Sequence, residues 1–155
     1  MKTIEIKGSV RKETGKKNTK KIRKEGSIPC VLYGGEKNIH FSAPENNFIH
    51  LVYTPHVYIV NLDVDGNLHK AVLKDMQFHP VSDDILHIDF LEIFDDRPVV
   101  IEIPIKLNGV PKGVKEGGKL YTMMRKLRVF ALPADLPDQM EIEVSHLDIG
   151  QSIYI

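Results

Sequence analysis

Residues 58–78 read YIVNLDVDGNLHKAVLKDMQF, and their pattern determines the predicted fold class. Apolar and polar side chains alternate through Tyr58–Val64, the period-2 signature of a half-buried strand. Asp65-Gly66 then favours a tight hairpin turn, because both residues tolerate the positive φ angles that such a turn requires. We therefore predict a hairpin whose return strand runs over Leu68–Phe78 and is ended by Pro80.

Before this hairpin, the sequence predicts further strands and two helices. Strands are expected around residues 4–10, 29–33 and 85–90. The first helix is predicted over 17–25 and ended by Gly26, which adopts a left-handed cap conformation readily. The second is predicted to begin at Ser42, whose spacing to Glu45 is that of a capping box. The side chains expected to form its buried face are Phe48, Leu51 and Val52.

A polar break at residues 94–98, FDDRP, divides the chain into two expected domains, 1–94 and 95–155. After the break, apolar residues alternate over 99–107, 127–131 and 142–144, which is typical of an all-β domain. A strand-like segment from Ile149 reaches Ile155 without a stop signal, so this C-terminal domain is expected to be truncated. The predicted fold class is mainly β, with an α+β N-terminal domain.

Composition indicates a cytoplasmic protein. A single cysteine, Cys30, cannot form an internal disulfide, which is consistent with a reducing compartment. The sequence contains no apolar run long enough to span a bilayer, and its first residues lack the apolar segment of a secretory signal. We therefore expect no membrane partner.

The zero net charge conceals a strong asymmetry. Residues 1–40 contain 11 Lys and Arg against 4 Asp and Glu, whereas residues 41–155 contain 10 basic and 17 acidic residues. On the first predicted helix, the spacing i, i+3, i+4, i+7 places four lysines in one stripe. Such a stripe repels itself unless an anion neutralises it, and a phosphate backbone does so with release of counterions. The lysines are Lys17, Lys20, Lys21 and Lys24.

A second candidate surface lies on the strand Ile85–Phe90. Its apolar residues share one face, so His87 and Asp89 project together from the other. A carboxylate beside a phosphate-binding surface is unfavourable unless it accepts specific hydrogen bonds, and an RNA minor groove offers guanine amino groups and ribose hydroxyls. Gln77 would extend this polar patch. From spacing alone, a solvated cationic face and ordinary surface polarity remain the simpler interpretations of both surfaces.

Three motifs resemble one protein family. Residues 10–16, VRKETGK, and 22–34, IRKEGSIPCVLYG, form the first; 75–80, DMQFHP, with 87–90, HIDF, form the second. The third comprises 109–114, GVPKGV, and 117–120, GGKL. Together they resemble bacterial large-subunit ribosomal protein number twenty-five, including its longer two-domain members of the CTC or general stress type.

That resemblance implies a six-stranded β-barrel with flanking helices, bound to the minor groove of an irregular internal loop in 5S ribosomal RNA. The second domain would contact neighbouring ribosomal proteins. The implied RNA-backbone contacts are Arg11, Lys20, Lys21 and Arg23, with a less decisive match at Lys16. The implied groove contacts are Tyr33, His87 and Asp89, with a less decisive match at Gln77.

Catalytic chemistry is not expected. Residues 113–119 match a phosphate-binding loop up to its lysine, but Leu120 stands where Ser or Thr should hold magnesium. Cys30 lies in an apolar strand, and the histidines show no metal-ligand spacing, so we expect no cofactor, metal or small-molecule substrate. Two other function classes remain: a non-ribosomal RNA-binding barrel, like the anticodon-reading barrels of tRNA synthetases, and a stress-related protein-interaction module using its acidic second domain.

Overall fold

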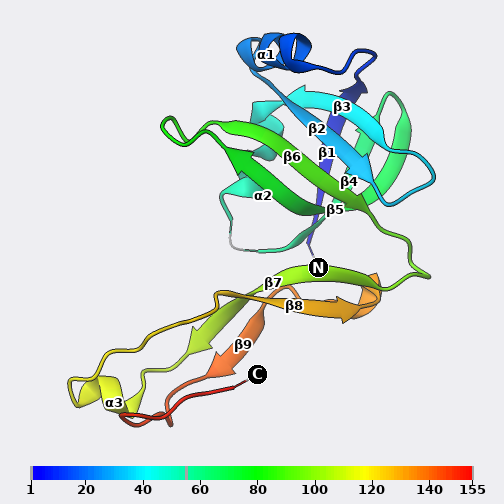
Figure 1. The fold of residues 1–155 in the computed structure, drawn as a ribbon. Helices are drawn as coiled ribbons and strands as arrows, with labels where there is room; N and C mark the ends of the chain where they lie inside the picture. Colours follow the sequence, from blue (N-terminus) through cyan, green and yellow to red (C-terminus); the bar gives the residue numbers. More distant parts are fainter. Residues whose placement is uncertain (1, 55, 155) are drawn as a thin grey trace.

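The structure, a computed structural model, describes residues 2–54 and 56–154 and contains a β-barrel followed by a smaller sheet (Figure 1). In this described part of the chain, six strands close into the barrel in the order β1-β3-β2-β6-β5-β4. The six-stranded barrel expected from the family resemblance is therefore confirmed. Its strands are β1 (Lys2–Val10), β2 (Ser27–Tyr33), β3 (Ile39–Pro44), β4 (Tyr58–Val64), β5 (Asn67–Phe78) and β6 (Ile85–Glu92).

Two parallel pairings close the barrel. β1 pairs with β4 along most of its length, and β2 pairs with β6 from Cys30 opposite Ile88 to Tyr33 opposite Leu91. The other four contacts between neighbouring strands are antiparallel. Because alternate residues of a strand point to opposite faces, this closure gives every strand one side in the core and one side outside.

Aromatic rings fill the barrel interior. The ring centroid of Phe90 lies 5.9 Å from that of Phe41 and 6.2 Å from that of Phe48. All three side chains are fully buried. Aliphatic residues from all six strands surround them, including Ile6, Leu32 and Leu62. This core explains the alternation that the sequence shows from one strand to the next.

The predicted hairpin is confirmed. β4 and β5 pair antiparallel, and the turn between them places Asp65 at φ 51° and Gly66 at φ 88°. The first predicted helix is also present as α1 (Lys16–Lys24), and Gly26 follows it at φ 73°. No helix among the described residues combines the length and apolar composition that a membrane span requires.

The predicted start of the second helix is wrong. Ser42 lies in β3, where the flanking Phe41 and Ala43 are buried and pair with β2, so the strand continues to Pro44. A 3-10 turn, η1 (Glu45–Phe48), and one helical turn, α2 (Ile49–Val52), follow without a side-chain cap. Local capping spacing was overridden by strand pairing and burial. The expected apolar face is nevertheless formed: Phe48 and Leu51 are buried and Val52 is half-buried.

The second sheet has the order β8-β7-β9, with β7 (Val99–Asn108) between β8 (Lys126–Ala131) and β9 (Met140–Glu143). β8 runs antiparallel and β9 parallel to β7. Two short helical turns, α3 (Lys112–Lys115) and η2 (Pro133–Asp135), lie in the connections. The strand expected from Ile149 onward is not formed in residues 149–154, and Ile155 lies outside the described residues. Whether the domain boundary lies at 94/95 remains a prediction.

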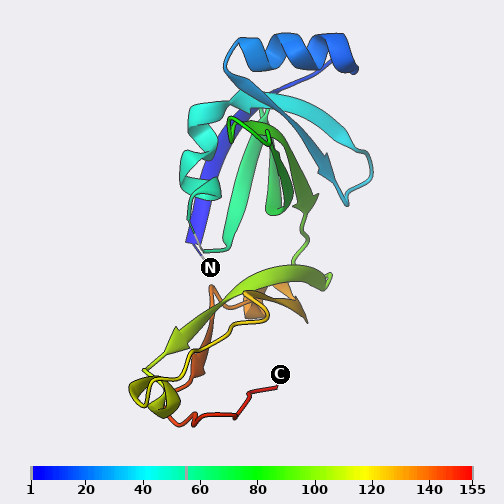
Figure 2. The ribbon, with the colours of Figure 1, turned by 60° about the vertical axis from the view of Figure 1, so that its left-hand side comes forward.

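An apolar cluster joins the barrel to the second sheet. Val72, on the outer side of β5, is completely buried and packs with Ile93, Ile101 and Ile103. Lys74 Nζ donates a hydrogen bond of 3.0 Å to the carbonyl oxygen of Val100, so a polar contact borders the cluster. Figure 2, turned by 60° from Figure 1, shows the second sheet at the end of the barrel away from α1.

We predict that Phe90→Ala lowers the free energy of unfolding by about 3–5 kcal/mol, because it leaves a cavity among packed rings. Phe130→Ala is the matched control, since that ring is 69% exposed on β8 and its removal should change stability by about 0.5 kcal/mol or less. Urea-induced unfolding followed by circular dichroism measures both. Equal effects of the two substitutions would contradict the described core.

Candidate nucleic-acid interface

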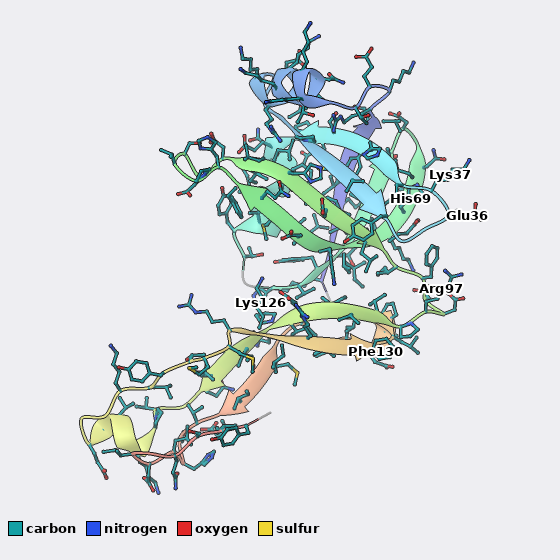
Figure 3. All side chains as sticks on the ribbon, viewed as in Figure 1. Glu36, Lys37, His69, Arg97, Lys126 and Phe130 are labelled. Carbon is teal, nitrogen blue, oxygen red and sulfur yellow. The ribbon has the colours of Figure 1, made fainter. Side chains whose placement is uncertain are left out.

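Helix α1 presents a dense group of cations to solvent. Its side chains are exposed or half-buried throughout, and the helix lies at one end of the barrel (Figure 3). Lys21 Nζ lies 3.9 Å from a carboxylate oxygen of Glu25, but both side chains are mostly exposed. Such a pair contributes little, so the positive charge of the helix is not neutralised by it. The predicted backbone contacts Lys16, Lys20 and Lys21 all lie here.

Polar bonds to the barrel hold α1 in place. Arg23 Nε donates to the carbonyl oxygen of Leu86 at 2.9 Å, and Arg11 Nη2 donates to Thr19 Oγ1 at 3.2 Å. The Nε atom of Arg11 is buried and has no hydrogen-bond partner among the described residues. The two arginines predicted as backbone contacts thus also position the helix, which the sequence analysis did not anticipate.

The outer surface of β2, β6 and β5 brings the predicted groove residues together. Gln77 of β5 lies opposite His87 of β6, and Asp89 lies between Val31 of β2 and Asp75 of β5. Tyr33 follows two residues after Val31 and so lies on the same side of β2. This polar surface, Tyr33, Asp75, Gln77, His87 and Asp89, is called the strand face below.

His87 and Asp89 are in direct contact. His87 Nδ1 lies 2.7 Å from Asp89 Oδ1, and both side chains are about 30% exposed or less. Oδ1 is buried and makes no other polar contact among the described residues, and its approach to His87 is a close charge contact instead of a hydrogen bond of good geometry. Because a buried carboxylate oxygen requires a donor, we assign the proton of the neutral imidazole to Nδ1. His87 then offers Nε2 as an acceptor, with its ring oriented by Asp89.

Tyr33 is kept in its neutral form. Partial burial, and then the negative charges of Asp89 and Asp75, raise the pKa of the Tyr33 phenol above its ordinary value. The hydroxyl therefore remains a hydrogen-bond donor at neutral pH. The strand face consequently combines an O–H donor, an imidazole acceptor and carboxylate acceptors.

The nine predicted site residues fall into two adjoining groups. α1 contributes four and the strand face four, while Arg11 follows β1 and contacts α1 through Thr19. Arg23 connects the groups, because its acceptor, Leu86, immediately precedes His87. The sequence analysis missed Asp75 as a member of the strand face. Its place depends on a β-bulge between Leu73 and Asp75, for which the strand pattern gives no signal.

The described residues form no metal site. Among residues 2–54 and 56–154, no group of three or more His, Cys, Asp or Glu could hold a metal ion. The glycine-rich segment 113–119 includes part of the helical turn α3 and then continues without regular structure, whereas a phosphate-binding loop continues into a helix. Cys30 is completely buried within β2, and burial raises the pKa of its thiol far above the ordinary value. Its role as a small hydrophobic residue is confirmed.

Comparisons with known proteins identify two family domains. Residues 6–90 match the model described as the Ribosomal L25p family, and residues 98–155 match the one described as Ribosomal protein TL5, C-terminal domain. The chain is 46% identical to large ribosomal subunit protein bL25 of Phocaeicola vulgatus and 51% identical to that of Azobacteroides pseudotrichonymphae, with all of this chain and 82% of each relative covered. It is 51% identical to bL25 of Christiangramia forsetii, of which 71% is covered.

We predict that the Cys30 thiol does not react with an aromatic disulfide reagent at mildly alkaline pH. The reactive species is the thiolate, and a raised pKa together with complete burial keeps the group neutral and inaccessible. Absorbance of the released reagent anion should stay flat in buffer and rise at once in concentrated urea. Rapid reaction of the folded protein would contradict the burial of β2.

Proposed function

The chain belongs to the Ribosomal L25p family, and we propose that within the large ribosomal subunit it binds 5S ribosomal RNA through α1 and the strand face. It is a structural, non-enzymatic ribosomal protein, located with the ribosome in the bacterial cytoplasm. In the proposed division of the chain, residues 1–94 are the 5S RNA-binding domain. Residues 95–155 contact neighbouring components of the subunit.

The observation that carries the proposal is the exposed cationic helix. The lysines of α1 repel one another, and their exposure leaves that repulsion to be relieved by a partner. A phosphate backbone relieves it and releases condensed counterions, which supplies most of the binding free energy. Arg23 uses Nε to hold the helix on β6, so its remaining guanidinium nitrogens are available to a phosphate oxygen.

The strand face supports recognition of a particular RNA site. An RNA minor groove exposes guanine amino groups and 2′-hydroxyls, which donate, and base and ribose oxygens, which accept. His87 Nε2 and the second oxygen of Asp89 can accept hydrogen bonds from the guanine amino groups and 2′-hydroxyls. The Tyr33 hydroxyl can donate to the base and ribose oxygens. These groups lie beside α1, so a duplex held by the lysines would have its groove within reach of the strand face.

We predict that affinity for 5S RNA falls steeply with salt. With about four to six phosphate contacts, the slope of log affinity against log salt should be roughly −3 to −5. The double variant Lys20→Ala/Lys21→Ala should reduce the size of this slope by about 1.8 and weaken binding to all RNA equally, because a phosphate contact carries no sequence information.

Lys37→Ala is the control for this experiment, since Lys37 lies on the loop between β2 and β3, away from α1 (Figure 3). Filter binding at several salt concentrations gives the slopes. A parent slope near zero, or the same change in both variants, would show that α1 is merely solvated.

We predict that Asp89→Ala weakens binding to 5S RNA by about 1–3 kcal/mol and leaves binding to unrelated RNA unchanged or stronger. The carboxylate repels every backbone but orients His87 and accepts hydrogen bonds only at the correct site. Because Asp89 acts partly through His87, losses in Asp89→Ala, His87→Ala and the double variant should be less than additive.

Glu5→Ala is the matched control for lost negative charge, because Glu5 is exposed on β1, across the barrel from β6. Competition between labelled 5S RNA and transfer RNA measures all four variants. If Asp89→Ala binds 5S RNA as tightly as the parent, the groove-reading role of the strand face is wrong.

A further inference from the structure

A groove of about 1170 Å³ separates the barrel from the second sheet. Its barrel side comes from β5, α2 and the residues between α2 and β4. Its other side comes from β7, β8 and the long connection between them. Its floor is apolar, with Leu51, Val72 and Ile101 among the lining residues. The hydrophobic cluster that joins the domains therefore continues into an open surface.

The charged residues that line this groove are cationic with one exception among those described. Five of its lining residues are Lys or Arg, and a single carboxylate, Glu102, lies among the described lining residues. Arg128 Nε is 3.4 Å from Glu102, so that carboxylate is already paired. Figure 3 shows Lys126 in the space between the second sheet and the barrel. The cations are Lys74, Lys119, Arg125, Lys126 and Arg128.

Charge is segregated within the second domain. Residues 109–130 contain 6 Lys and Arg against 1 Glu, whereas residues 131–155 contain 5 Asp and Glu and neither Lys nor Arg. The sheet order places β8, which belongs to the basic part, and β9, which belongs to the acidic part, at opposite edges of the sheet. This segregation leaves the net charge of the domain near zero while giving its groove side a positive potential.

Aromatic surfaces accompany the cations. Tyr121 is 75% exposed and lines the groove, and Lys119 Nζ lies 5.4 Å from the centre of its ring. Tyr58 and His56 line the opposite wall and meet edge to face, with ring centroids 6.5 Å apart. Positive charge interleaved with aromatic rings is the composition of surfaces that bind unpaired nucleic acid, because bases stack on the rings while the charges contact phosphates.

We propose that this groove is a second RNA-binding surface, and that it takes an unpaired RNA strand. The proposal rests on the proposed ribosomal function, since the large subunit supplies the RNA. An acidic protein segment would satisfy the charges but would leave the exposed aromatic rings without a stacking partner. α1 and the second sheet lie at opposite ends of the barrel in both ribbon views (Figures 1 and 2), and that sheet lines the groove, so the two surfaces are distinct.

The test uses the full chain carrying Lys20→Ala/Lys21→Ala, so that α1 contributes less to binding. The probe is a fluorescein-labelled oligouridylate of about 12 nucleotides, within the range one such surface covers. Adding Arg125→Gln/Lys126→Gln should weaken anisotropy-detected binding roughly tenfold and reduce the size of the salt slope by about 1.4, the value for two single-strand phosphate contacts.

Lys112→Gln/Lys115→Gln is the matched control. It removes two cations of the same basic segment, but α3, at the tip of the second domain (Figure 1), contributes no lining residue to the groove. Its affinity should stay close to that of the background, because neither lysine lines the groove. Tyr121→Ala should weaken binding on the order of tenfold, and Tyr121→Phe should preserve it. Equal losses in the groove and control variants would overturn the proposal.

Two further measurements separate the proposals. With α1 intact, Arg125→Gln/Lys126→Gln should keep its affinity for 5S RNA; a loss as large as that for oligouridylate would make the groove part of one interface and overturn its assignment as a second surface. Failure of the parent chain to bind 5S RNA would overturn the proposed function without affecting the oligouridylate result. Binding of a polyglutamate peptide, but not oligouridylate, in the groove would overturn the RNA assignment.

Discussion

The parallel pairing of β2 with β6 positions both the core and the candidate interface. Opposite Cys30 and Leu32, β6 places Ile88 and Phe90 in the barrel interior, and the same register turns Val31 and Asp89 outward. A shift by one residue would exchange these sets, placing the Asp89 carboxylate among the aromatic rings and Phe90 in water. Burial of Phe90 therefore determines where the polar residues of β6 lie. The strand face has its geometry because the core cannot accept another register.

Helix α1 is not held in place by the core, since its described side chains contribute little to it. Hydrogen bonds from Arg23 and Arg11, rather than apolar burial, attach it to the barrel. Such attachment is weak compared with packing, and the repulsion between its lysines opposes it. The helix is therefore the part of the fold whose stability depends most on an anionic partner. Binding and ordering of α1 are thermodynamically linked.

Features determined by local chemistry could be predicted from the sequence. The turn at Asp65-Gly66 depends on φ angles that these two residues tolerate, and the pairing of His87 with Asp89 depends on strand alternation. The start predicted at Ser42 failed, because burial of Phe41 and pairing with β2 outweighed a capping pattern. Asp75 and the groove between the domains could not be foreseen. Both depend on contacts distant in sequence: a bulge on β5, and the packing of Val72 against β7.

The two proposed polyanion-binding surfaces, at opposite ends of one barrel, would together have a consequence that neither has alone. When α1 binds one RNA segment, binding of a neighbouring segment of the same RNA in the groove becomes intramolecular. Its effective concentration is then set by the distance between the two sites. The apolar cluster around Val72 restricts that distance, because it attaches the second sheet to β5 instead of leaving it on a free linker. Even a low affinity of the groove for RNA is then sufficient for the protein to bridge two RNA segments. The junction between the domains therefore determines whether the second surface adds affinity, since a flexible junction would lower the effective concentration of the second RNA segment at the groove.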